Sequence, residues 1–119
     1  MLNKYLVKGH SFRKAGSLKK AIQIYIKASK SQQQCSERDS AYYMQAFTYV
    51  LMAHRMHQQC QLGADLRSPE DPLLKANRCL RQIQTKNFDP EALGLPVLAG
   101  YEIDEIAKHA SRDEENTTH

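Results

Sequence analysis

The residues most capable of chemistry in this 119-residue chain are two histidines and a cysteine, which recur every three residues. They are His54, His57 and Cys60, and side chains three apart are neighbours on a helix. Imidazole and thiolate are ligands that Zn²⁺ prefers, but a closed site needs four ligands. No fourth ligand stands at a matching spacing, and the alternative is the exposed polar end of a helix. The sequence therefore predicts neither a metal nor another cofactor.

Other catalytic patterns are missing from the sequence. It has no glycine-rich phosphate loop, no Gly-x-Ser-x-Gly turn and no His-Glu-x-x-His pair. Three acidic residues stand close together at Glu102, Asp104 and Glu105. We expect them mostly on the solvent side of a helix, which is a poor setting for an acid–base pair. The sequence therefore predicts a protein that is not an enzyme.

Charge is distributed unevenly along the chain. Residues 1–30 hold eight basic residues and no acid, whereas residues 91–119 hold two bases and seven acids. The eight basic residues are Lys4, Lys8, Arg13, Lys14, Lys19, Lys20, Lys27 and Lys30. Such a segment favours an acidic peptide or a nucleic acid as partner, and a plain solvated helix face is the alternative. Tyr5 and Phe12 lie among them, at positions that also suit packing between helices.

Periodicity predicts that these residues lie on helices. Between Gly16 and Ala28, apolar residues follow the spacing of a helix with one buried face. Similar stripes elsewhere predict an all-α fold of about five helices. We place these helices within residues 2–15, 18–30, 40–60, 72–86 and 97–111, in a single domain over residues 1–111. Residues 112–119 are expected to form a flexible acidic tail.

The third predicted helix is the most apolar stretch of the chain. Its apolar side chains lie on nearly all sides, which is typical of a helix that is central in its fold or carries an extra interface. Full burial is hard to arrange in so small a domain. We therefore expect a partner surface or a homodimer contact here, formed by Tyr42, Tyr49 and Met56.

Composition indicates an ordinary globular protein of the cell interior. Hydrophobic residues make up 41% of the chain and charged residues 25%, which is typical of soluble domains. No run approaches the ~20 apolar residues of a membrane span, and the N-terminus lacks the pattern of a secretory signal. The three cysteines are an odd number without regular spacing. We expect free thiols, a cytoplasmic or nuclear location and no integral membrane contact.

The first two predicted helices resemble a tetratricopeptide (TPR) repeat over residues 2–33. The small and aromatic positions of that motif match Gly9, Phe12, Ala21, Tyr25 and Ala28. Glycine costs roughly 1 kcal/mol relative to alanine inside a helix, so Gly9 needs a structural reason. We expect that Gly9 permits close approach of the second helix. The resemblance implies antiparallel helix hairpins in a right-handed array or bundle.

The TPR resemblance also implies a groove lined by the first helix. The residues facing it would be Leu6, His10, Arg13 and Lys14. A basic cluster of this kind could hold an acidic peptide through charge-assisted hydrogen bonds. The Lys/Asn pair of the carboxylate-clamp TPRs is absent, because Leu6 and His10 occupy its places.

Two other families share features with the chain. Residues 4–58 are similar to the three-helix MIT domain of membrane-remodelling proteins. A looser resemblance is to the C-terminal homology domain of AFF (Lilliputian-type) transcription-elongation scaffolds, which is built of TPR-like helices and self-associates. It is carried by Ser40, Tyr42, Met44 and Thr48, then by Pro69-Glu70-Asp71 and Arg78-Cys79-Leu80.

Together these patterns predict a non-catalytic protein–protein interaction module, either an adaptor or an assembly subunit. Its partner would be a protein or an acidic peptide that engages the basic first hairpin or the apolar third helix. The alternative is a nucleic-acid-associated or transcription-complex factor that uses the basic hairpin.

Overall fold

The structure, a computed structural model, describes residues 4–31, 35–61 and 70–117. These residues form α1 (Lys4–Lys14), α2 (Leu18–Ser31), α3 (Cys35–Gln61), α4 (Glu70–Arg81) and α5 (Gly100–Thr117). A short 3₁₀ turn, η1 (Glu91–Leu93), lies between α4 and α5. No strand occurs in the described ranges. The prediction of an all-α fold with about five helices is confirmed.

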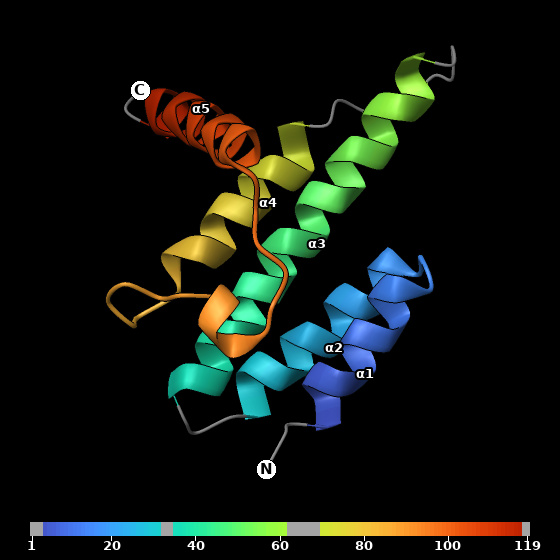
Figure 1. Cartoon of the computed structure of the whole chain (residues 1–119). Helices are drawn as coiled ribbons and strands as arrows, with labels where there is room; N and C mark the ends of the chain where they lie inside the picture. The colour runs from blue at the N-terminus through green and yellow to red at the C-terminus, as the bar shows by residue number, and fades with distance from the viewer. Residues whose placement is uncertain (1–3, 32–34, 62–69, 118–119) are drawn as a thin grey trace.

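The helices pack in the order in which they follow one another along the chain. α1 packs against α2, α2 against α3, α3 against α4, and α4 against α5 (Figure 1). α2 and α3 run antiparallel, since Gln45 contacts Tyr25 while Arg55, further along α3, contacts the turn at Gly16. The α1–α2 hairpin and α5 consequently lie on opposite sides of the central α3 (Figure 1).

The hairpin of α1 and α2 contains a very close contact between Gly9 and the Tyr25 ring. The predicted apolar face of α2 is buried, from Leu18 to Ala28. Within it, the Tyr25 ring lies directly on Gly9 of α1, where an added Cβ atom would come within 2.6 Å of Tyr25 Cε1. Any other residue at this position would push the helices apart. The expectation that Gly9 permits close helix approach is confirmed.

Replacing this glycine is expected to destabilise the fold although alanine favours helices. Gly9→Ala gains roughly 1 kcal/mol in helix propensity but overpacks the Tyr25 ring at a cost of about 2 kcal/mol, so we expect a net loss of about 1 kcal/mol in the free energy of unfolding. Gly100→Ala is the control, because nothing lies within 4 Å of its added Cβ. Urea unfolding followed by circular dichroism would measure both. A stability of Gly9→Ala equal to or above that of the unchanged chain would contradict the packing described.

α3 owes its apolar character to its central position. It is covered by α2 on one side and α4 on the other, and its Met44 and Val50 are almost completely buried. The segment before α5 also crosses it (Figure 1). Tyr43 of α3 holds that segment, because its hydroxyl donates to the Pro96 carbonyl at 2.7 Å and accepts from the Leu98 N–H at 3.1 Å.

Helix α4 ends earlier than the sequence predicts. We expected it to extend to residue 86, but it ends at Arg81. The cause is the buried carboxylate of Asp39, at the start of α3, which accepts the backbone N–H groups of Gln84 and Thr85 at 3.1 and 3.0 Å. The Thr85 hydroxyl donates to the same carboxylate. Backbone groups held in this way cannot continue a helix.

Both ends of α5 also differ from the prediction. The helix begins at Gly100 and not at residue 97, because Tyr43 holds residues 96–98 and Glu102 caps the helix by accepting the Ala99 N–H at 2.8 Å. Residues 112–117, which we expected in the acidic tail, continue α5 to Thr117. No glycine or proline interrupts this stretch, and its residue types are compatible with a helix. Residues 118–119 lie outside the described part.

The two hydrogen bonds of Tyr43 give a second stability prediction. Tyr43→Phe keeps the ring but leaves the Pro96 carbonyl and the Leu98 N–H without their partner, so we expect a loss of about 1–3 kcal/mol in unfolding free energy. Tyr101→Phe removes a hydroxyl from a ring that is 65% exposed and should change stability little. Thermal unfolding by calorimetry would compare them. Equal melting temperatures for the two variants would contradict this role of Tyr43.

Candidate interaction site

The solvent side of the α1–α2 hairpin carries a cluster of lysines that we call the basic hairpin surface. Four of its lysines lie on α2, where about 100° of rotation per residue places them opposite the buried face. Three more lie on α1. All seven are exposed: Lys4, Lys8, Lys14, Lys19, Lys20, Lys27 and Lys30. Within the described part of the chain, no carboxylate is recorded in an ion pair with any of them.

The two aromatic residues of this surface are already engaged. Tyr5 and Phe12 are half-buried, which follows from their position beside Gly9 at the contact between α1 and α2. The Lys4 ammonium lies 5.4 Å from the centre of the Tyr5 ring, and the Lys20 ammonium lies 5.9 Å from that of Phe12. Each lysine thus interacts with a ring face while its charge stays in solvent.

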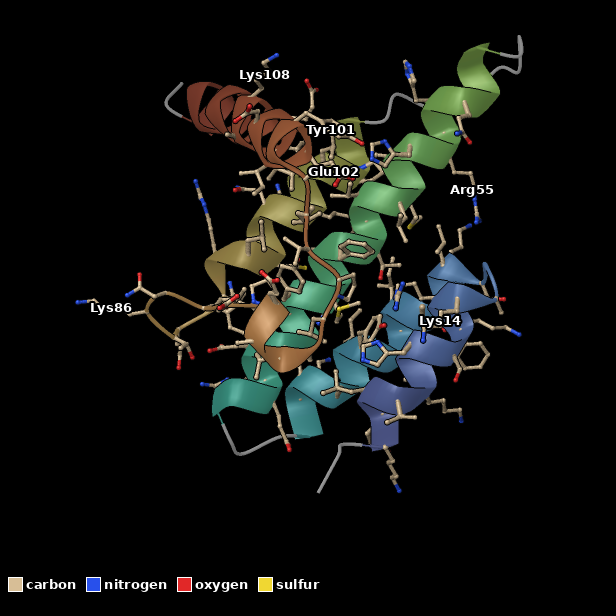
Figure 2. All side chains as sticks on the ribbon, viewed as in Figure 1. Lys14, Arg55, Lys86, Tyr101, Glu102 and Lys108 are labelled. Carbon is tan, nitrogen blue, oxygen red and sulfur yellow. The ribbon has the colours of Figure 1, made fainter. Side chains whose placement is uncertain are left out.

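The four residues that the TPR resemblance assigns to a groove do not share one open face. Leu6 is partly buried against the core, whereas Lys14 is exposed and lies on the surface of the hairpin (Figure 2). His10 and Arg13 are half-buried and turn toward Tyr25. Their contacts to its hydroxyl measure 2.6 Å from His10 Nδ1 and 3.4 Å from Arg13 Nε.

The contacts around Tyr25 suit a neutral His10. Arginine can only donate, so the Tyr25 oxygen accepts from Arg13, and its hydroxyl can donate to an unprotonated His10 Nδ1. In this arrangement the His10 proton lies on Nε2. Burial lowers the pKa of His10, and the charges of Arg13 and Lys14 lower it further. Burial also raises the pKa of the Tyr25 hydroxyl, against the opposing effect of Arg13.

Acidification is expected to weaken the hairpin through His10. Because its pKa is lower in the folded chain, its contribution to stability is complete above the unfolded value of about 6.5 and is lost as the pH falls below it. His10→Asn offers an acceptor near the position of Nδ1 and cannot gain a proton. Urea midpoints measured at about pH 7.5 and about pH 5.5 should therefore fall more for the unchanged chain than for His10→Asn. The same fall in both would refute this assignment.

The three residues predicted to form an interface on α3 are all half-buried. Tyr49 packs against the core, and Lys75 of α4 lies over its ring at 5.9 Å from the centre. Tyr42 and Met56 are also of intermediate exposure. Their spacing of seven residues places them along one side of α3, where each is partly covered.

Two of the three candidate metal ligands of α3 lie in the described part, and their surroundings differ. His54 turns toward α5, where its Nε2 lies 2.7 Å from Glu102 Oε2, while His57 is exposed. The Cys60 side chain lies outside the described part. Among the described residues, no group of three His, Cys, Asp or Glu side chains could hold a metal ion.

The sequence did not predict the role of Glu102. We expected it on the solvent side of α5, but its side chain is only 12% exposed and points toward α3 (Figure 2). One carboxylate oxygen caps α5 at Ala99 and the other contacts His54, so Glu102 joins two helices. Its place three residues after Ala99 is that of a capping-box glutamate, but Ala99 offers no capping oxygen that would have marked the motif in the sequence.

Comparison with known proteins adds no relative. No protein-family model matches the chain, and neither curated proteins nor solved structures give a significant match. Within the described helices, none is long and apolar enough to cross a membrane.

Proposed function

We propose that this chain is a non-catalytic protein–protein interaction module, an adaptor or assembly subunit. Its basic hairpin surface would bind an acidic segment of a partner protein. The observation that carries the proposal is the exposure of seven lysines on one hairpin whose described residues include no acid. The right-handed TPR-like arrangement and the cytoplasmic or nuclear location belong to the same proposal.

The geometry of α2 suits a partner segment of moderate length. Its lysines extend from Lys19 to Lys30, which is about 16 Å along the helix axis. An extended acidic peptide of about five residues covers that distance, as does an acidic helix of about eleven residues. Exposed ion pairs are individually weak and screened by salt. Binding would therefore depend on several lysines together and decline steeply with ionic strength.

A protein partner is favoured over a nucleic acid by the state of the aromatic rings. Binding of single strands commonly combines a basic groove with aromatic rings on which bases stack. Here the Tyr5 and Phe12 rings are half-buried and interact with Lys4 and Lys20. The nucleic-acid alternative is left with the lysine charges alone.

The described cysteine, Cys79, does not support a catalytic alternative. Cys79 is a free cysteine packed against the core, where its thiol contacts the Gln45 side chain at 3.6 Å. Burial raises the pKa of Cys79 to about 11, so the thiol is protonated at neutral pH. A protonated thiol is a poor nucleophile.

The proposal can be tested with a fluorescein-labelled deca-glutamate peptide. We expect anisotropy to show binding at about 50 mM salt and a marked loss at about 500 mM. Lys20→Glu/Lys27→Glu should weaken binding about tenfold, since it places like charges on the solvent face of α2. Lys86→Glu/Lys108→Glu makes the same change in net charge at exposed positions outside the hairpin, and should weaken binding much less.

Two outcomes would overturn the proposal. One is the absence of peptide binding at low salt while a single-stranded or duplex DNA of similar length binds, which would favour the nucleic-acid alternative. The other is an equal loss of peptide binding in the two double variants, which would mean that net charge alone, and no particular surface, attracts the peptide.

A further inference from the structure

We propose that an acidic segment recognised by the hairpin is helix α5 of a second copy of this chain, docked head-to-tail on the outer face of α1. This inference rests on the proposed function, because it names an occupant for the α1 part of the basic hairpin surface. It is carried by charge complementarity between two helices that cannot meet within one molecule, since they lie on opposite sides of α3 (Figure 1).

The two helices carry equal and opposite formal charge. α1 holds four basic residues and no acid, which gives +4. α5 holds six acidic and two basic residues, which gives −4. Lys14 on the hairpin and Lys108 on α5 mark these two sides of the molecule in Figure 2. A second copy placed with its α5 on this α1 brings unlike charges together, whereas a symmetric pairing of α1 with α1 would oppose like charges.

The outer face of α1 has the composition of a contact surface. Tyr5, Gly9 and Phe12 lie on the side that packs against α2 or are partly buried there. The opposite side is exposed and consists of Lys4, Val7, Lys8, Ser11, Lys14 and Ala15. Val7 is 48% exposed and stands among the lysines as an apolar centre.

The outer face of α5 is the counterpart. Ile106 and Glu102 point inward, toward α4 and α3, and the remaining described positions face solvent. Asp104 and Glu105 supply acidic groups on this exposed side, together with Lys108, which lies 3.5 Å from Glu105. Next to them, Ile103 is 51% exposed and Ala107 is exposed. The outer face of α5 thus has acidic groups beside a small apolar area. It complements the outer face of α1, where lysines surround Val7.

Helix dipoles favour an antiparallel arrangement of the two helices. The first turn of α1 has no acid, and the last turn of α5 has no base, so neither terminal partial charge is neutralised by its own helix. Antiparallel docking places the positive end of α1 at the negative end of α5. The same orientation brings Lys14, in the last turn of α1, near Asp104 and Glu105 in the first half of α5.

One helix pair buries less surface than the roughly 800 Å² per partner of a standard stable interface. The assembly is therefore expected to be weak and sensitive to salt. Because its two faces differ, each copy presents one free basic face and one free acidic face after pairing. Such a contact propagates into short chains and does not stop at a dimer.

Charge reversal on each face provides the test. Lys8→Glu/Lys14→Glu reverses part of the α1 face, and Asp104→Lys/Glu105→Lys reverses part of the α5 face. Sedimentation velocity at about 0.5 mM protein and about 50 mM salt should show the unchanged chain associating, and each variant associating at least about tenfold more weakly. An equimolar mixture of the two variants should regain assembly, as should one chain that carries all four substitutions.

Regained assembly in the mixture could not be explained by non-specific attraction between molecules of opposite net charge. The α1 variant has a formal net charge of zero and the α5 variant one of +8, starting from +4, so the mixture contains no oppositely charged pair of molecules. Lys75→Glu/Lys86→Glu is the matched control, because it also gives zero net charge but lies at exposed positions outside the basic hairpin surface and α5. It should assemble like the unchanged chain, and circular dichroism would verify that every variant is folded.

The outcomes separate this inference from the function on which it rests. A monomeric chain at high concentration and low salt overturns head-to-tail assembly, and if the chain still binds the deca-glutamate peptide, the proposed function stands without it. Loss of assembly in the Lys75→Glu/Lys86→Glu control, or a mixture that stays monomeric, also overturns docking of α5 on α1. Failure of both assembly and peptide binding removes both proposals.

Discussion

The close contact of Tyr25 with Gly9 is the constraint on which the N-terminal half of the molecule depends. Only the absence of a Cβ atom at Gly9 allows the ring to lie between α1 and α2. The hydroxyl of the same ring then needs buried partners, and His10 and Arg13 provide them. The Arg13 guanidinium also lies over the Phe47 ring of α3, 5.6 Å from its centre. The group around Tyr25 therefore includes a side chain of α3. A tyrosine that is completely buried thus joins three helices.

The C-terminal half depends on polar anchors that α3 supplies. Asp39 holds the chain after α4, and Tyr43, one turn further along α3, holds the chain before α5. Burial would raise the pKa of Asp39, but the hydrogen bonds from Thr85 and Gln84 outweigh it, and the pKa is lowered. The carboxylate is therefore ionised as well as buried, and it is satisfied by the backbone that it positions. Residues 82–99 keep a defined path in this way with little secondary structure of their own.

These anchors explain which features the sequence could predict. Local periodicity was sufficient for the number of helices and for the buried face of α2, because both depend on neighbouring residues. The C-terminal end of α4 depends on Asp39 and the start of α5 on Tyr43, about 45 and 55 residues away, and no local pattern encodes such partners. The same reason applies to His10 and Arg13, whose charge suggested an open surface. Their side chains turn inward because they contact the Tyr25 hydroxyl. The helical pattern identified Tyr25 only as an aromatic core residue and gave no indication of partners for its hydroxyl.

The lysines of the hairpin stand apart from all of these structural contacts. The buried polar groups that fix the fold include Asp39, Tyr25 and Tyr43, whereas the seven lysines are exposed. A mixed surface of both signs keeps a small protein soluble with less repulsion between like charges. Gathering one sign on the N-terminal hairpin and the other on α5 adds repulsion within each region and is not needed for packing. The separation of charge is therefore the feature on which the proposed recognition of an oppositely charged segment rests.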